Sequence, residues 1–255
     1  FSLADPERGR RDYLQAHIPG AVYAHLDEDL SGQIVPGVTG RHPLPPVATI
    51  SQKFGMWGIG PGVQVISYDD AGGALAASRL WWLLRWLGHE TVAVLDGGWQ
   101  AWQQEGRLVR SGPENRGQRH FIPSLQPDMV VSTQEVAAID QEPGYCLLDA
   151  RSHERYLGIN ETIDPVAGHI PGAVSAPYAD NLTEEGFFRR PEELRERYTQ
   201  LLGITPAKQA IVYCGSSVSA AHNILAAAYV GLDLPRLYAG SWSEWITDPR
   251  RPVGK

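Results

Sequence analysis

Short apolar runs alternate with longer stretches of helical periodicity along the whole chain. The short runs predict strands at residues 63–68, 91–95, 146–149, 210–213 and 236–238. The longer stretches predict helices at residues 74–87, 191–202 and 218–230, and another helix that begins within 99–104. This alternation is typical of an α/β fold in which a largely parallel sheet is covered by helices on both faces. Such sheets bind ligands beyond the carboxyl ends of their strands.

The chain repeats itself once. His-Ile-Pro-Gly-Ala-Val occurs at residues 17–22 and again at 169–174, and two further pairs of segments follow in the same order. Residues 65–69 match 210–214, and residues 95–99 match 238–242, with offsets of 152, 145 and 143 residues for the three pairs. A period this long excludes a solenoid and predicts a duplicated domain.

The segment between the two copies is rich in glycine, proline and scattered charges, which predicts a linker. We therefore expect domains at residues 1–105 and 132–255, joined by a linker at 106–131. Ser132 or Thr133 is expected to cap the first short helix of the second domain.

Cys214 has the sequence context of a reactive thiol. It follows the apolar run Ile211-Val212-Tyr213 and precedes a small, polar loop that leads into an alanine-rich helix. Backbone N–H groups at a helix start attract an anion, and a thiolate is the nucleophilic form of cysteine. The first copy has Asp69 at the matching position. Because an aspartate cannot carry sulfur, we expect the catalytic site in the second domain.

The composition of the chain argues against several other classes of protein. The net charge of −7 argues against a broad nucleic-acid surface, and no apolar run has the length of a membrane span. The chain has two cysteines, so no disulfide framework is indicated, and Cys146 in a predicted strand is interpreted as a core residue. No histidine or cysteine spacing indicates a metal site, and we expect no cofactor. A reducing, cytoplasmic setting and a monomer or weak dimer are expected, without a nucleic-acid or membrane partner.

Together, these segments resemble the tandem-domain rhodanese family. The resemblance rests on the duplication, on Thr39-Gly40-Arg41-His42-Pro43-Leu44-Pro45, on Leu95-Asp96-Gly97-Gly98-Trp99 and on Gly240-Ser241-Trp242. The loop Cys214-Gly215-Ser216-Ser217-Val218-Ser219-Ala220 is similar to that of the 3-mercaptopyruvate sulfurtransferases, and less like that of the thiosulfate sulfurtransferases. In this family the first domain normally opens with a helix and a strand before the first repeat segment. Since Phe1 lies inside that domain, we expect its sheet to lack those first elements.

The resemblance implies a sulfurtransferase in which Cys214 takes a sulfur from 3-mercaptopyruvate or thiosulfate, forms a persulfide, and passes the sulfur to a thiol or cyanide. It also implies a proton-relay triad of Asp27, His42 and Ser216. Arg155 would hold the donor's carboxylate or sulfonate. The loop residues Gly215, Ser217, Val218 and Ser219 would bind the transferred sulfur through their backbone.

Two positions depart from the family pattern. Ser217 stands where the mercaptopyruvate branch has glycine, so it is strained if that position requires a positive φ. That branch also has a second substrate arginine soon after the first, whereas residues 158–168 contain none, which keeps thiosulfate open as the donor.

Two alternatives remain for comparison. Cysteine phosphatases need arginine six residues after the cysteine, and this chain has Ala220 there. A non-catalytic rhodanese-like binding or regulatory module would be expected to lose the cysteine, which is present. The His17 and His169 copies lie in both halves, which favours a structural role for each.

Overall fold

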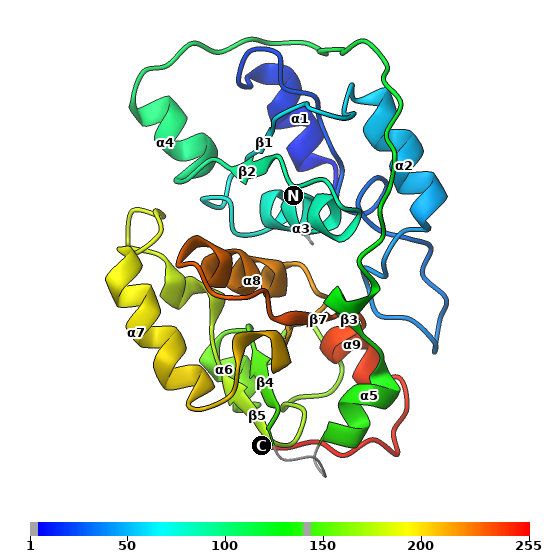
Figure 1. Ribbon diagram of the computed structural model, residues 1–255, viewed down its shortest axis with the longest axis vertical. Helices are drawn as coiled ribbons and strands as arrows, with labels where there is room; N and C mark the ends of the chain where they lie inside the picture. The colour runs from blue at the N-terminus through cyan, green and yellow to red at the C-terminus, as the bar shows by residue number, and fades with distance from the viewer. Residues whose placement is uncertain (1–4, 140–143) are drawn as a thin grey trace. The chain divides into compact units, whose positions relative to one another are not determined.

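A computed structural model describes residues 5–139 and 144–255 of the chain. The structure divides into two compact units, each drawn in Figure 1. The first unit comprises Phe1–Gly32 and Leu44–Gln126, and the second comprises Gln33–Pro43 and Pro127–Lys255. The segment that carries Arg41 and His42 is thus grouped with the second copy of the repeat. The expected boundaries at residues 105, 106, 131 and 132 remain a prediction.

The first unit pairs two short parallel strands with helices. Val65 lies opposite Val92 in the register, and Ser67 lies opposite Val94. The longest helix of this unit, α3 (Ala76–Trp86), contributes much of the core, and its residues Trp82, Leu83 and Leu84 are fully buried. Gly88 has a φ of +79°, which only glycine adopts without strain, so it ends this helix as expected. The elements in order are α1 (Arg8–Gln15), α2 (Val47–Met56), β1 (Val65–Ser67), α3 (Ala76–Trp86), β2 (Val92–Val94) and α4 (Gly98–Gln104).

The second unit is built on a five-stranded sheet with the order β3-β7-β6-β4-β5, in which every pairing is parallel. Its strands are β3 (Val130–Val131), β4 (Cys146–Asp149), β5 (Ala173–Ser175), β6 (Ala210–Tyr213) and β7 (Arg236–Tyr238). Its helices are α5 (Thr133–Ala138), α6 (His153–Tyr156), α7 (Pro191–Leu202), α8 (Ser219–Tyr229) and α9 (Ser241–Trp245). Single 3₁₀ turns lie at Pro127–Met129, Tyr178–Asn181 and Ala207–Gln209.

Helices cover both faces of this sheet. On one face, Ile211 and Tyr213 of β6 pack in a cluster with Val136 of α5 and with Trp242 and Trp245 of α9. On the other face, α8 packs against β6, β7 and α7. All four residues of β6 are completely buried, which explains why this strand is a continuous apolar run in the sequence. The predicted α/β architecture with a mostly parallel sheet is confirmed.

Four predicted elements have the expected bounds: the structure reproduces β4, α7, β6 and β7 to the residue. The elements β1, β2, α3 and α8 are each shorter than predicted, and α4 begins one residue early, at Gly98. Ser132 caps α5: its Oγ accepts the Glu135 N–H, and the Glu135 carboxylate accepts the Ser132 N–H at 2.6 Å. This reciprocal pair is the capping box that favours a helix start.

Candidate functional site

Cys214 directly follows β6, at the carboxyl edge of the sheet, and the loop after it leads into α8 at Ser219. The residue is 2% exposed. Its backbone is held by α9: the Cys214 N–H donates to Ser241 Oγ at 3.1 Å, and the Trp242 N–H donates to the Cys214 carbonyl at 2.9 Å. Ser241 adopts a φ of 55° to make this contact. The cysteine is therefore fixed between a strand end and a helix start.

The loop after Cys214 has the strained residue that the sequence predicted. Ser217 has a φ of 63° and is completely buried, which is unfavourable for a residue with a Cβ atom. The Ser243 N–H donates to the Gly215 carbonyl at 2.9 Å, and this contact fixes the loop from the side of α9. Val218 precedes α8, and Ser219 opens it.

His42 and Ser216 lie in contact. The Nδ1 atom of His42 is 2.7 Å from the Oγ atom of Ser216, and both residues are buried. This pair is two thirds of the triad that the sequence predicted. Asp27 belongs to the first unit, where burial raises the pKa of its carboxyl group. Its place in the triad stays a prediction.

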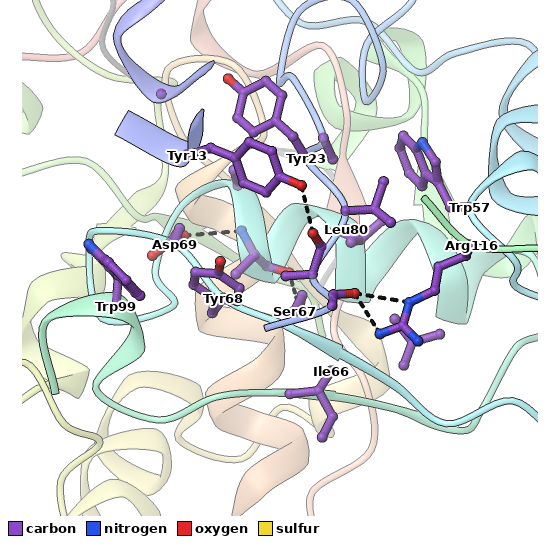
Figure 2. Close-up of a pocket in the computed structure, with 18 of the residues that line it drawn as sticks. Tyr13, Tyr23, Trp57, Ile66, Ser67, Tyr68, Asp69, Leu80, Trp99 and Arg116 are labelled. Carbon is purple, nitrogen blue, oxygen red and sulfur yellow. Dashed lines mark hydrogen bonds between the residues drawn. The ribbon is translucent and has the colours of Figure 1, made fainter. Parts of the chain in front are cut away.

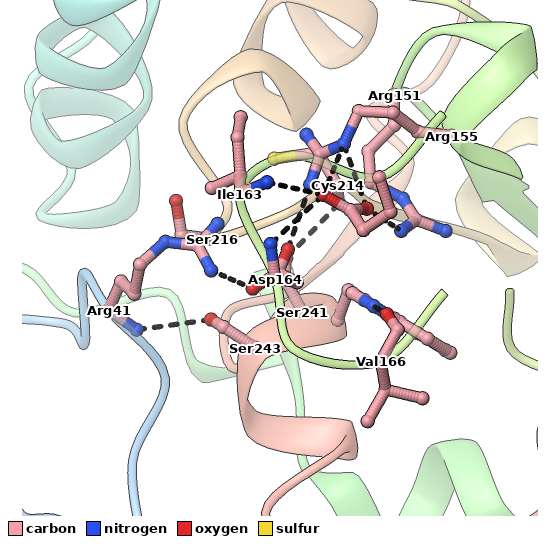
Figure 3. Close-up of polar contacts among 12 residues, drawn as sticks. Arg41, Arg151, Arg155, Ile163, Asp164, Val166, Cys214, Ser216, Ser241 and Ser243 are labelled. Carbon is pink, nitrogen blue, oxygen red and sulfur yellow. Dashed lines mark hydrogen bonds and ion pairs between the residues drawn. The ribbon is translucent and has the colours of Figure 1, made fainter. Parts of the chain in front are cut away.

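Arg155 projects from α6 into an ion-pair cluster beside the Cys214 loop. Its Nε atom donates to both oxygens of Glu161, and its Nη2 atom donates to Asp164 Oδ2 at 2.8 Å. A second guanidinium, that of Arg41, binds the other oxygen of Asp164 (Figure 3). A Cβ atom added at Gly215 would lie 2.8 Å from Arg41 Nη2 and 3.6 Å from Arg155 Nη1. Two cationic groups thus lie next to the residue that follows the cysteine.

A third arginine supports this cluster from the sheet. Arg151 pairs with Asp149 through its Nη2 atom at 2.6 Å, reaches Glu161 at 3.4 Å, and lies 4.7 Å over the ring of Trp242. Burial disfavours the charged form of Glu161, but the hydrogen bond from Arg155 and those from two backbone N–H groups outweigh it, so its pKa is lowered. Each arginine of the cluster is thus paired with at least one carboxylate.

The matching loop of the first unit is already occupied by its own anion. The Asp69 carboxylate accepts backbone N–H bonds from Ala71 and Gly73 on one oxygen, and from Leu75 and Ala77 on the other, at 2.8–3.0 Å. Figure 2 shows Asp69 with one of these bonds. A carboxylate fits such a ring of amide donors at the start of a helix. This loop can therefore bind an anion through its backbone amides. In the first unit the anion is the carboxylate of Asp69, a side chain that cannot carry sulfur.

Two histidines and the other cysteine have structural surroundings. The Nδ1 atom of His17 lies 2.8 Å from the Tyr13 carbonyl, and the Nδ1 atom of His169 lies 2.8 Å from the Tyr156 carbonyl. Their equivalent bonds in both units support the predicted structural role. Cys146 is half-buried in β4, and burial raises the pKa of its thiol, which disfavours the reactive thiolate.

A cavity of about 910 Å³ lies within the first unit (Figure 2). It runs between β1 and residues 20–24, which contain the end of the first repeat segment. In the second unit, the equivalent elements β6 and β5 both pair with β4. The cavity therefore corresponds to the place of a strand in the repeat, and none of its lining residues comes from the Cys214 loop. We therefore attribute the cavity to the way in which the strands of the first unit are arranged.

One acidic cluster was not predicted from the sequence. Potential ligand atoms of Glu7, His25 and Glu28 lie within 4.8 Å of one another. Both ring nitrogens of His25 already face backbone groups, the Pro6 carbonyl and the Asp27 N–H. We therefore do not assign a metal site to it.

The Rhodanese-like domain pattern matches residues 7–105 and 132–248. The chain belongs to the rhodanese family. It is 48% identical over 254 residues to a protein of Pseudomonas aeruginosa named a probable 3-mercaptopyruvate sulfurtransferase, covering 99% of this chain and 89% of that protein. It is 35% identical to the thiosulfate sulfurtransferase of Bos taurus, covering 94% of this chain and 80% of that one. The structure of 3-mercaptopyruvate sulfurtransferase from Leishmania major matches with a TM-score of 0.84 at 32% identity, covering 96% of this chain and 68% of that one.

This rhodanese is thus a tandem-domain sulfurtransferase, as the sequence resemblance indicated. Among the residues that the structure describes, no helix combines the length and apolar character needed to cross a bilayer.

Sequence reasoning missed three participants in the rhodanese site. Arg41 precedes a residue that was singled out, but its partner Asp164 is 123 positions away. Ser241 lies in the recognised segment Gly240-Ser241-Trp242, yet nothing in the pattern shows that its hydroxyl holds the Cys214 N–H. The positive φ of Ser241 could not be predicted from the periodicity of the sequence.

Proposed function

We propose that this rhodanese transfers a sulfane sulfur from an anionic donor, 3-mercaptopyruvate or thiosulfate, to a thiol or cyanide through a persulfide on Cys214. The observation that carries the proposal is the position of Cys214 between β6 and α8, with two guanidiniums beside Gly215 and with Ser216 of the same loop in contact with His42. A buried sulfur with adjacent cations suits attack on a donor that carries a negative charge.

In the first half of the reaction, the Cys214 thiolate attacks the donor's outer sulfur. With 3-mercaptopyruvate, the carbon–sulfur bond breaks, and its electron pair leaves as the enolate of pyruvate, which then gains a proton. With thiosulfate, the sulfur–sulfur bond breaks, and sulfite leaves with the electron pair. In both cases Cys214 keeps the transferred sulfur as a persulfide.

The two donors differ in their need for a proton. The enolate must be protonated at carbon, whereas sulfite leaves as a stable anion. Ser216, hydrogen-bonded to His42, is proposed to polarise the donor's carbonyl group or to relay that proton. Asp27 is proposed to orient the imidazole, which would complete the triad. This geometry favours 3-mercaptopyruvate as the donor.

In the second half, the acceptor attacks the outer sulfur of the persulfide, and the Cys214 thiolate leaves. Cyanide gives thiocyanate, and a thiol gives a new persulfide. The backbone amides of Gly215, Ser217, Val218 and Ser219 are proposed to hold the persulfide's terminal sulfur before transfer. The filled loop around Asp69 supports this role, because there the same type of loop binds an anion through four amides.

Mass spectrometry of the intact protein tests the proposal. After incubation with 3-mercaptopyruvate, and separately with thiosulfate, the protein should gain the mass of one sulfur atom, and cyanide should remove it. The Cys214→Ser variant should gain nothing, while Cys146→Ser should gain as much as the wild type. No gain with either donor would instead favour a binding or regulatory module. Comparing kcat/KM for the two donors then establishes the donor preference.

A further inference from the structure

The carboxylate of Asp164 is buried between two arginines. Its side chain is 1% exposed, and each of its oxygens binds a different guanidinium: Oδ1 binds Arg41, and Oδ2 binds Arg155 (Figure 3). An aspartate with both oxygens bound to arginine has the contacts that a bound carboxylate ligand would have.

The same two guanidiniums lie beside the residue that follows Cys214. Both approach Gly215, the residue after Cys214, within 3.6 Å of the place of a Cβ atom. A donor whose sulfur reaches Cys214 has its anionic group a few bonds away. That group therefore meets the same two guanidiniums that Asp164 binds, but from another side: Asp164 binds Arg41 Nη1 and Arg155 Nη2, whereas Arg41 Nη2 and Arg155 Nη1 face Gly215.

The charged groups of this cluster balance one another, so they have no excess positive charge to attract a donor anion. Three arginines, Arg41, Arg151 and Arg155, are paired with three carboxylates, Asp149, Glu161 and Asp164. A donor anion entering this cluster adds a fourth negative charge. The carboxylates already present therefore weaken its attraction to the guanidiniums.

Asp164 is also held in place by its own loop. The Glu161 Oε1 atom accepts the Ile163 and Asp164 N–H groups, each at 2.9 Å. Further along, the Trp242 indole N–H donates to the Val166 carbonyl at 3.0 Å. The loop is thus fixed on both sides of Asp164, and its carboxylate cannot withdraw without breaking these contacts.

We propose that Asp164 is an internal competitor of the sulfur donor. Its carboxylate balances the positive charge of the Arg41–Arg155 anion position, which would hold the donor's carboxylate or sulfonate through Arg41 Nη2 and Arg155 Nη1, and so raises the donor concentration needed to load Cys214. The inference rests on the proposed function, because it assumes that this anion position serves the donor. Asp164 acts through the two arginines and takes no part in bond breaking, so it is a specificity-determining residue.

The test is the donor concentration that half-saturates persulfide formation in a single turnover. Asp164→Asn keeps the shape but removes the charge, and the half-saturating concentration should fall by about tenfold, as expected when a competing charge-assisted contact is removed. The fall should be larger for thiosulfate, a dianion, than for 3-mercaptopyruvate. Asp180→Asn removes an equal charge from an exposed site of the same unit and should change nothing.

Asp164→Ala provides an independent measurement. Formate should inhibit this variant competitively against the donor, because it can fill the vacated carboxylate position, and it should affect the wild type far less. If Asp164 only braces its loop, both variants will show a lower melting temperature together with an unchanged or higher half-saturating concentration. That result, or the lack of formate inhibition, overturns the inference.

Failure of the proposed function has a different signature. Pyruvate binding to Cys214→Ser, with and without Asp164→Asn, can be measured by calorimetry and needs no sulfur transfer. Tighter binding in the double variant supports the inference even if the wild type never forms a persulfide. A wild type that loads sulfur normally, together with unchanged pyruvate binding in the double variant, would refute the inference alone.

Discussion

His42 Nδ1 lies 2.7 Å from Ser216 Oγ, across 174 positions of sequence. This contact joins the segment around Arg41 to the loop of the reactive cysteine, and both residues are buried. We expect His42→Ala to lower kcat for 3-mercaptopyruvate by about 100-fold, the typical loss of a proton-transfer group. The rate with thiosulfate should hardly change, because sulfite leaves without a proton. Steady-state kinetics with both donors measures the difference, and an equal loss for both would remove the proton-relay role.

The guanidinium shape of Arg155 should matter as much as its charge. Arg155→Lys keeps the charge but loses the fork that binds Glu161 and Asp164 together. We expect kcat/KM for either donor to fall by about tenfold, equivalent to about 1.4 kcal/mol. Arg190→Lys, at a side chain that is 79% exposed, is the matched control and should keep wild-type kinetics. Unchanged kinetics in Arg155→Lys would place donor binding elsewhere.

Ser217 stores backbone strain in the catalytic loop. Ser217→Gly should raise the free energy of unfolding by about 1 kcal/mol, since glycine adopts its φ of 63° without steric cost. Ser219→Gly, at the first position of α8, should have the opposite sign, because glycine loses more chain entropy in a helix. Urea unfolding of both variants gives the comparison. A destabilised Ser217→Gly would mean that its side chain contributes more than the strain costs.

Asp69 should contribute to the folding stability of the protein and not to sulfur loading. Asp69→Asn leaves two of four amide donors with an amide group instead of a carboxylate oxygen, and we expect a loss of about 1–3 kcal/mol of folding free energy. Sulfur loading at saturating donor should stay complete, because Cys214 belongs to the other unit. Chemical denaturation and intact mass together measure both quantities, and loss of loading in a folded variant would contradict this assignment.

His222 should make the second unit less stable in acid. Burial, followed by repulsion from Arg197, lowers the pKa of His222 to about 3, while its ordinary value is 6.5. Between these two values the unfolded chain binds the extra proton, so stability falls as the pH falls. Relative to the wild type, His222→Phe should become more stable by about 1.4 kcal/mol for each pH unit below 6.5. Unfolding curves from pH 7 to 5 measure this slope, and parallel curves would show that the histidine is protonated in the fold.

The sequence predicted what depends on local pattern and on repetition. The buried strand Ala210–Tyr213 and the helix cap at Ser132 appear as expected, since an apolar run and a cap both depend on adjacent residues. The strain at Ser217 could be predicted because a serine replaced the family's glycine. By contrast, the meeting of Arg41 with Asp164 depends on the path of two loops through space, and no periodicity encodes it. Local patterns therefore placed Cys214 after a strand, while the contact of Arg41 with Asp164 beside its loop could be seen only in the folded structure.

The loop around Asp69 has a consequence for stoichiometry. Its amides are satisfied by a side chain that can be neither released nor exchanged, so the first copy of the domain is permanently in a bound-like state. A titration of loaded sulfur should therefore saturate at one equivalent per chain, although each chain carries two copies of the fold. One copy keeps its carboxylate for the lifetime of the protein, whereas the other, by the proposed mechanism, would gain and lose a sulfur at every turnover.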